Sequence, residues 1–565
     1  MRRQFINRNT IGEDLTAGLV LGIRSIPDGL ANGLLALINP IYGLYGYMMG
    51  TFSGAFFTSS TFMSIQATSA MALVVASVPQ VAEGRSPNTP LFALAILTGV
   101  LMLLAGLLKL GSLVRFVPNA VMTGFVNAVA VLIILGQLDD FTGYSSVGAN
   151  RIARTWNLLQ NLDQVHLPTL LVGILTIILI LTLEKTSLKA LGMVVAMIVA
   201  SLVVPLFGAE QVQLVRDVAT IPSSLPRPLL PPLSVFPGLI VPALALTFVG
   251  LMQGAGITQS IPEPDGRYPD ASGDFIGQGV ANMVSGLFQG TAVGGSLSAT
   301  ALVISAGARS RFANISAGVV MALAIVLFGR FVGAIAMPVL AGLLIVVGFR
   351  TLKPKQISMV WKTGLVQQAV MALTFLAALF VPLQYAVLLG VALAVLLYVF
   401  QQSNKMTVKA WQIGPGQYPV EGEPPTAVPS QQVTILVPYG SLFYAAAPVF
   451  NQQLPEVTDT TRHAVVVLVL RGQTEVGSTF LKVLAQYANQ LHQQQSKLAL
   501  AGVEPYVLTQ MERTGILRTI GRENVFPASE GVGTALLQAV EAAETWIAAQ
   551  PEEPLAAVNA VEPIA

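Results

Sequence analysis

The sequence predicts a polytopic α-helical membrane protein with a small α/β domain at its carboxyl end. Apolar residues make up 53% of the 565 residues and charged residues 10%, whereas charged residues are about 25% of soluble proteins. Apolar runs of nearly bilayer length follow one another as far as residue 400. After residue 401 the runs become short and the charge becomes acidic, with 9 Lys or Arg against 14 Asp or Glu.

About fourteen apolar segments are predicted to lie in the membrane, because a helix needs roughly 20 mainly apolar residues to cross it. They are residues 15–37, 41–57, 62–81, 91–110, 118–138, 167–183, 191–207, 235–257, 275–288, 297–308, 315–328, 332–347, 366–381 and 385–400. Several are too short to span alone. The first holds Arg24 and Asp28 and runs directly into the second, which is unlike a cleaved signal peptide.

The distribution of lysine and arginine predicts the orientation of these spans. An even number of spans places both termini on one side, and the side richer in Lys and Arg is cytoplasmic. The side of the N-terminus would hold 16 such residues and the other side 6. We therefore expect an integral protein of the plasma (inner) membrane with cytoplasmic termini and with loops near residues 139–166 and 208–233 outside.

Composition excludes several classes of function. The chain has no cysteine, so it forms no disulfide or thiolate metal site. The three histidines, His166, His463 and His492, are too scattered in the sequence to suggest a metal cluster. The net charge is only +2 and the sequence has no basic run, so it does not indicate a surface that binds nucleic acid. Without a catalytic triad pattern or an ATP-binding phosphate loop, we expect neither an enzyme nor a bound cofactor.

Two segments begin with small and polar residues before they become apolar. Residues 59–70 read SSTFMSIQATSA and residues 290–300 read GTAVGGSLSAT. Each is the third segment of its half of the fourteen. Matching interrupted segments indicate a transporter's midplane binding site, because two facing helix starts present N–H groups and positive dipole ends to an anion. Close packing between helices, which small residues also favour, is the alternative.

At these residues the chain resembles the sulfate permease family of anion transporters, in its bacterial sulfate and bicarbonate branch. Residues 26–31 (IPDGLA) resemble the family's I-P-Q-G-M-A, residues 277–282 (GQGVAN) its G-Q-G-x-x-N, and residues 294–300 (GGSLSAT) its T-G-S-x-S-R-T. The resemblance implies a homodimer and two inverted repeats of seven spans. In an elevator-like cycle, a core of spans 1–4 and 8–11 would move against a gate of spans 5–7 and 12–14.

The resemblance also implies that the anion lies between the starts of spans three and ten. No catalytic residue or metal ligand is expected. Carried over by position, the substrate-binding candidates are Gln66, Thr68, Ser69, Gln253, Ser296, Leu297 and Ser298.

Two charged residues of the family pattern are absent. Gln253 stands where span eight usually carries a carboxylate, and Ala299 stands where span ten often carries an arginine. The family's carboxylate is a candidate for Na⁺ or H⁺ coupling, so the resemblance puts such coupling in doubt here. Without the arginine a dianion would meet less compensating charge, which favours bicarbonate over sulfate.

Arg24 and Asp28 flank Pro27 in the first segment with i,i+4 spacing, which lets them meet on one helix face. Ionisable residues inside a membrane are costly and point to function. One hypothesis gives Asp28 a proton-sensing or gating role and lets Arg24 supply positive potential. The alternatives are a self-neutralising structural pair, or an Arg24 that snorkels to the interface.

The last part of the chain predicts a small α/β domain. Residues 402–430, rich in proline from residue 415 onward, predict a linker, and residues 431–550 alternate strand-like and helix-like runs. Their order, with residues 470–478 (LRGQTEVGS) and 500–505 (LAGVEP), resembles a STAS domain. Ser478 occupies the loop that is phosphorylated in related proteins, but no Asp precedes it. Folding, trafficking and dimer contacts are the expected tasks, and residues 551–565 are expected to be disordered.

Together these observations predict a secondary transporter of a small inorganic anion that contacts membrane lipids and a second copy of the chain. An anion channel or an anion-sensing membrane protein is the alternative. Saturable flux accelerated by a counter-anion would distinguish a carrier from a channel.

Overall fold

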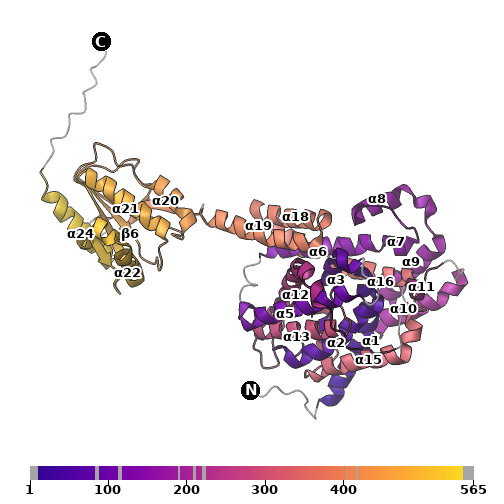
Figure 1. The fold of residues 1–565 in the computed structure, drawn as a ribbon. Coiled ribbons are helices and arrows are strands. Elements are labelled where there is room, and N and C mark those ends of the chain that lie inside the picture. Colours follow the sequence, from indigo (N-terminus) through magenta and orange to yellow (C-terminus); the bar gives the residue numbers. More distant parts are fainter. Residues whose placement is uncertain are drawn as a thin grey trace. The chain divides into compact units, whose positions relative to one another are not determined.

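The structure is a computed structural model that describes residues 10–82, 88–111, 118–188, 191–207, 212–218, 224–403, 405–414 and 418–551. It divides into two compact units, Met1–Ala394 and Val395–Ala565 (Figure 1). The first is almost entirely helical and the second has a sheet. The tail predicted to be disordered lies outside the described residues from 552 onward.

A helix lies in each of the fourteen apolar segments. In chain order they are α1 (Ile11–Leu35), α2 (Pro40–Phe57), α3 (Ser69–Ala76), α5 (Thr89–Leu107), α6 (Asn119–Gly136), α9 (Leu167–Leu183), α10 (Gly192–Val203), α12 (Ile240–Ser260), α13 (Ala271–Leu287), α14 (Leu297–Ser305), α15 (Phe312–Val332), α16 (Met337–Thr351), α18 (Leu365–Phe380) and α19 (Leu383–Ser403). In the described ranges, five helical stretches are long and apolar enough to cross a membrane, and three further apolar helices are shorter.

Shorter elements connect these helices. They are α4 (Pro79–Ala82), α7 (Leu138–Thr142), α8 (Arg151–Gln160), α11 (Val215–Val218), α17 (Pro354–Trp361) and the two-residue strands β1 (Ile65–Gln66) and β2 (Gly294–Gly295).

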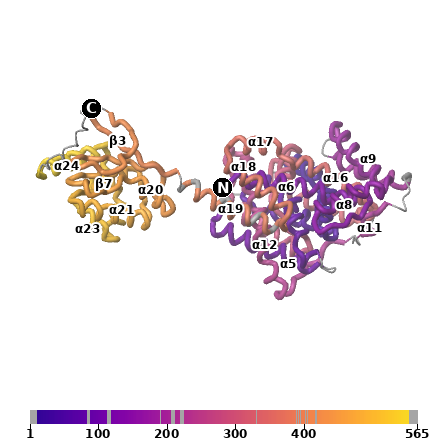
Figure 2. The backbone as a smooth tube through the Cα atoms, turned by 90° about the horizontal axis from the view of Figure 1, so that it is seen from above, coloured from indigo at the N-terminus to yellow at the C-terminus, as the bar shows by residue number. Residues whose placement is uncertain are grey.

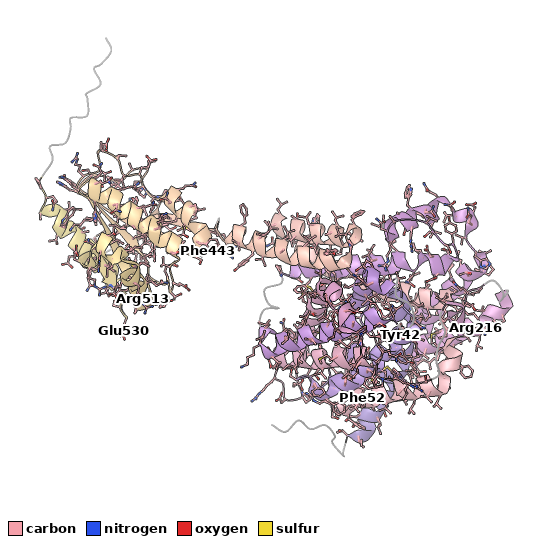
Figure 3. All side chains as sticks on the ribbon, viewed as in Figure 1. Tyr42, Phe52, Arg216, Phe443, Arg513 and Glu530 are labelled. Carbon is pink, nitrogen blue, oxygen red and sulfur yellow. The ribbon has the colours of Figure 1, made fainter. Side chains whose placement is uncertain are left out.

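The helices of the first unit pack in two groups. Figure 2 shows α9 beside α16, which belong to the same group. In one group α13 packs between α2 and α5, and α1 packs on α2 and α15; in the other, α16 contacts α6 and α9, and α18 contacts α6. An aromatic contact joins two helices of the first group: Tyr42 of α2, labelled in Figure 3, meets Phe92 of α5 edge-on with 5.1 Å between ring centroids. The two groups contain the spans predicted as core and gate, while the motion between them stays a prediction.

The second unit is a six-stranded sheet with helices on both faces. Its strand order is β4-β3-β5-β6-β7-β8. β3 pairs antiparallel with both of its neighbours, β4 and β5, and the pairs β5–β6, β6–β7 and β7–β8 are parallel. Alternate residues of the central strands face opposite sides: Leu436 and Leu468 pack under α21, and Ile435 and Val467 pack under α24. The elements are β3 (Thr407–Gln412), β4 (Val420–Gly422), β5 (Val433–Tyr439), α20 (Ala447–Gln453), β6 (Val465–Val469), α21 (Ser478–Gln493), β7 (Lys497–Val503), α22 (Pro505–Thr514), α23 (Ile516–Ile520), β8 (Val525–Pro527) and α24 (Thr534–Ala548).

Two of these strands form inside residues 402–430, which the proline content predicted to be a linker. β3 pairs antiparallel with β5 from Thr407↔Tyr439 to Trp411↔Ile435, and β4 pairs with β3. The β-branched and aromatic residues of β3 lie before the first proline and fit a pleated edge. The linker prediction is therefore wrong for the residues of these two strands.

Candidate functional site

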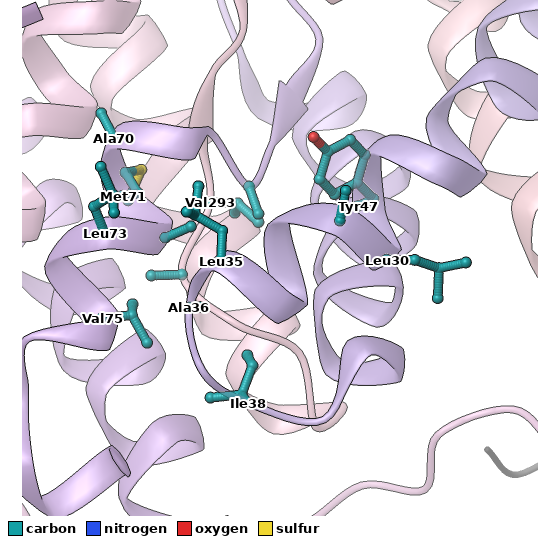
Figure 4. Close-up of a cluster of buried hydrophobic side chains, with 14 of the residues drawn as sticks. Leu30, Leu35, Ala36, Ile38, Tyr47, Ala70, Met71, Leu73, Val75 and Val293 are labelled. Carbon is teal, nitrogen blue, oxygen red and sulfur yellow. The ribbon is translucent and has the colours of Figure 1, made fainter. Parts of the chain in front are cut away.

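The two interrupted segments meet at the centre of the first unit. β1 directly precedes α3, β2 directly precedes α14, and the two strands pair antiparallel with Ile65 opposite Gly295 and Gln66 opposite Gly294. Both short helices therefore start at the same place. Beside them, Leu35, Met71 and Val293 lie in one apolar cluster (Figure 4).

Each short helix begins with a hydroxyl cap. Thr68 Oγ1 accepts from Met71 N at 3.4 Å, and Ser296 Oγ accepts from Ala299 N at 3.3 Å. A cap of this kind satisfies one of the first N–H groups and leaves the others without an intrahelical acceptor. The remaining N–H groups and the positive ends of both helix dipoles suit a negative ligand.

Gln253 of α12 is tied to the start of α3. Thr68 Oγ1 donates to Gln253 Oε1 at 2.9 Å, so the amide oxygen is engaged and the amide nitrogen is left as a donor. Both side chains are half-buried. A carboxylate in this position would present only acceptors, whereas the amide adds a donor to the same place.

α12 also approaches β2 so closely that side chains have no room. A Cβ atom on Gly295 would lie 2.9 Å from the Cα atom of Gly254, and one on Gly294 would lie 3.2 Å from the Cα atom of Gly250. The two glycines of α12 are four residues apart and lie on one face of the helix. Glycines on both sides of the contact therefore set the distance between α12 and β2.

Two buried amides of α13 hold β2 from the other side. Asn282 Oδ1 accepts from Val293 N at 2.8 Å, and Asn282 Nδ2 donates to Val293 O at 2.6 Å. Gln278 Oε1 accepts from Gly295 N at 3.0 Å. Both amides are fully buried. Both residues belong to the GQGVAN motif that carries the resemblance, but no binding role was predicted for them. Amides spaced i,i+4 among small residues are a signal that could have found them.

β1 is held by different side chains. Thr51 Oγ1 of α2 donates to Ile65 O at 3.1 Å, and Ser64 Oγ donates to Asn314 Oδ1 of α15 at 2.6 Å. Gln66 is buried and its Nε2 donates to Ser25 Oγ of α1 at 2.9 Å. The side chain of this predicted ligand is therefore engaged by α1.

The loop ahead of β1 is clamped by two buried charged residues. Asp274 of α13 accepts from Ser60 N at 2.7 Å and from Ser59 Oγ at 2.8 Å. Arg311, just before α15, donates to Thr58 O and to Ser59 O, each at 2.7 Å. Two helices of the first group, α13 and α15, are thus fastened to the segment that leads into α3.

The other candidates divide by exposure. Ser69 and Ser296 are half-buried, while Leu297, 53% exposed, and Ser298 are open. Ser296 Oγ and Ser298 Oγ lie 3.3 Å apart. The structure thus joins Thr68 to Gln253 and Ser296 to Ser298, with the two pairs on either side of the paired strands.

Arg24 and Asp28 do not form the ion pair that their spacing allows, at least among the described residues. Arg24 Nε is buried and has no hydrogen-bond partner in the described ranges. Asp28 lies within electrostatic range of Arg24 and of Arg350 and Glu184. Arg350 Nη1 of α16 donates to Glu184 Oε1, at the end of α9, at 3.0 Å. The gating role and the self-neutralising pair therefore both stay predictions.

A small cavity of about 20 Å³ lies beside Gln253, between α12 and the helices α6 and α18. That volume is enough for one water molecule. Its walls are mostly apolar; they are formed by Val121, Met122, Phe125, Val126, Phe248, Val249, Met252, Gln253 and Thr374.

Comparison with known proteins decides the family. The sulfate permease family model matches residues 11–374, and the STAS domain model matches residues 424–531. The chain belongs to the sulfate permease family. Members of this family are anion transporters, so the chain is an integral membrane transporter of inorganic anions and not an enzyme.

Sulfate permease relatives and fold neighbours match most of the length of this chain. YbaR of Bacillus subtilis, described as a candidate sulfate transporter, is 30% identical over 70% of this chain and 78% of its own. Sulfate transporter 4.1 of Arabidopsis thaliana is 22% identical over 94% of this chain and 80% of its own. The structure of murine Slc26a9 in the inward-facing state has a TM-score of 0.82 at 18% identity and covers 96% of this chain and 93% of that one.

The transmembrane domain of the cyanobacterial bicarbonate transporter BicA shares the fold of the first unit. Its TM-score is 0.57 at 22% identity, covering 69% of this chain and 99% of that domain. With these matches the predicted fold class, a polytopic helical membrane protein with a STAS domain, is confirmed.

Proposed function

We propose that this sulfate permease family member is a secondary transporter that binds its anion between the starts of α3 and α14. The pairing of β1 with β2 carries the proposal, because it brings two helix N-termini to one place. Backbone N–H groups, the hydroxyls of Ser69, Ser296 and Ser298, and the amide of Gln253 would supply the donors. Thr68 would contribute as the cap that positions Gln253.

We favour bicarbonate over sulfate as the substrate. The proposed donors are neutral, and α14 carries Ala299 at the position where the family often has an arginine. Each additional negative charge in a low-dielectric site raises the cost of desolvation. The names of the relatives support both anions, since one fold neighbour is a bicarbonate transporter and several sequence relatives are sulfate transporters.

The transport cycle we propose is an elevator-like movement of the group that contains α1 and α13 against the group that contains α6 and α16. The protein would work as a homodimer with cytoplasmic termini. Asp28 and Arg24 would act as gating residues, because they lie in α1 near the Arg350–Glu184 pair of the other group. Coupling to Na⁺ or H⁺ through residue 253 is not expected, because an amide neither titrates nor carries the negative charge that favours a cation.

The test is uptake of radiolabelled bicarbonate and of radiolabelled sulfate into proteoliposomes, each with and without a sodium gradient. We expect saturable bicarbonate uptake that internal bicarbonate accelerates and sodium does not change. Large currents without exchange would instead identify a channel. Sodium-dependent uptake would show that a cation is coupled elsewhere, and Asp28→Asn would then be the first variant to measure.

A further inference from the structure

Helix α8, between α7 and α9, has an apolar face that no described residue covers. Leu158 is 4% exposed and points into the protein, but Trp156 is 64% exposed and Leu159 is 55% exposed. Leu162, just after the helix, is 60% exposed. Trp156 and Leu159 are three residues apart and so lie on one face of the helix. We call these three exposed side chains the α8 patch.

The α8 patch continues into a surface that faces lipid. α9 begins at Leu167, shortly after the patch, and is an apolar helix of a membrane transporter. Its exposed side chains recur at helical spacing along one side and are 40–61% exposed: Leu167, Leu171, Ile174, Ile178 and Leu181. A stripe of this kind on a membrane helix faces acyl chains. Because the chain runs from the patch directly into the top of this stripe, α8 lies at the height where α9 enters the bilayer.

The other side of α8 is fixed to the protein. The helix packs on α6, where the side chain of Arg151 lies against Gly136, with 3.0 Å between Arg151 Nε and the place of a Cβ atom on that glycine. Burial lowers the pKa of Arg151 to about 10, which still leaves it protonated at neutral pH. Arg154 is exposed and lies on the opposite side of the helix from Trp156, and a basic residue on the polar face of an amphipathic helix is typical of helices that lie in the headgroup region.

We propose that α8 is an interfacial anchor that lies in the headgroup region of one leaflet and buries the α8 patch among the upper acyl chains. Tryptophan is the side chain most typical of this depth, and Arg154 is placed to meet lipid phosphates. Because α8 packs on α6, the anchor would hold the group that contains α6 and α16 at a fixed depth in the bilayer. This last consequence rests on the proposed elevator-like cycle, but the location of α8 does not.

Tryptophan fluorescence tests the location directly, since the chain has 4 tryptophans. The variant W361F/W411F/W546F keeps Trp156 alone. The full chain is reconstituted into phosphatidylcholine and phosphatidylglycerol vesicles that contain lipids brominated either near the headgroup or near the chain end. We expect at least twofold stronger quenching by the shallow bromines than by the deep ones, and weak quenching by aqueous iodide.

A matched variant, W156F/W361F/W546F, keeps Trp411, which is half-buried in the sheet of the second unit, and we expect neither bromolipid to quench it. Strong iodide quenching of Trp156 without bromolipid quenching would place α8 in water and overturn the proposal. Protection of Trp156 from both quenchers would overturn it as well, because a protein surface, such as a second copy of the chain, would then cover the patch. None of these measurements requires transport, so failure of the anchor and failure of the proposed function remain distinguishable.

Discussion

The two short helices of the site start at the same place, but their lead-in strands are built differently. β1 carries ordinary side chains, and Thr51 fixes its backbone while Ser25 engages its glutamine. β2 consists of two glycines that are pressed against α12 on one side and held by the amides of α13 on the other. β1 is therefore held by Thr51 and Ser25 and is approached by Gly50 of α2, where a Cβ atom would lie 2.9 Å from Ile65 O. β2 is itself made of glycine and depends on the two buried amides of α13.

The helix starts differ in the same way. Thr68, at the start of α3, is half-buried and bonded to Gln253, whereas Leu297 and Ser298, at the start of α14, are exposed. From this difference we expect the α3 side to fix the geometry of the proposed site and a ligand to reach the α14 side first. The predictions below test this difference, from the largest expected effect to the smallest.

The close approach of α12 to β2 predicts the largest effect. A Cβ atom on Gly254 would lie 2.1 Å from Gln278 Nε2, so Gly254→Ala must displace a fully buried amide and release Gly295 N. We expect a cost of about 1–3 kcal/mol from overpacking and loss of most anion uptake, measured together with the thermal unfolding midpoint. Gly256→Ala in the same helix, where nothing lies within 4 Å, is the matched control and should transport normally.

The next largest effect concerns stability, because β1 and the residue ahead of β2 are held by different numbers of side-chain hydrogen bonds. Asn282→Leu leaves both polar groups of Val293 unpaired, at about 1–3 kcal/mol each, whereas Thr51→Val removes a single bond to Ile65, worth about 1 kcal/mol. Thermal unfolding of the purified proteins should therefore show the larger drop for Asn282→Leu. Equal drops would mean that the two lead-ins are anchored alike and that the comparison fails.

Gln253 of α12 lies near the first residues of both α3 and α14. The substitution Gln253→Glu replaces its hydrogen-bond donor with a carboxylate. At neutral pH we expect bicarbonate uptake to fall about tenfold, because about 1.4 kcal/mol of repulsion changes binding by a factor of ten. Protonation removes the negative charge of the glutamate, so the ratio of bicarbonate uptake by this variant to uptake by the unmodified protein, both measured at the same pH, should rise as the pH is lowered. Uptake equal to the unmodified protein at every pH would show that residue 253 does not face the anion.

The smallest effects are expected from single hydroxyls. A neutral hydrogen bond contributes about 0.5–1.5 kcal/mol, so Ser298→Ala should raise the apparent KM about 2–10-fold. Ser69→Ala on the more buried side should have less effect if the α14 side meets the anion first. Ser305→Ala, at the far end of α14, serves as the control with no expected change in KM. A larger effect from Ser69→Ala than from Ser298→Ala would reverse the assignment of the two sides.

Hydropathy was sufficient to predict the helices, because a membrane helix must satisfy its own backbone and stay apolar whatever its neighbours are. The meeting of the two interrupted segments was also predictable, from their matching places in the two halves. The contacts of individual side chains were not. Gln66 turns to Ser25 because α1, which is distant in the sequence, supplies its partner. The strand β3 was missed because it was grouped with the proline-rich residues that follow it, and β4 was missed because it lies among those prolines.

The clamp on the loop ahead of β1 has a consequence for how the protein is made. α3 has 8 residues and α14 has 9, which at 1.5 Å per residue cannot cross a bilayer of about 30 Å. The carboxylate that holds Ser60 is 214 residues further along the chain. At about 5–20 residues per second, a ribosome needs about 10–40 s to reach it. During that time the loop ahead of β1 lacks this carboxylate, although α1 and α2, which engage β1, are already made. We therefore expect the start of α3 to reach its final position only after α13 has been made.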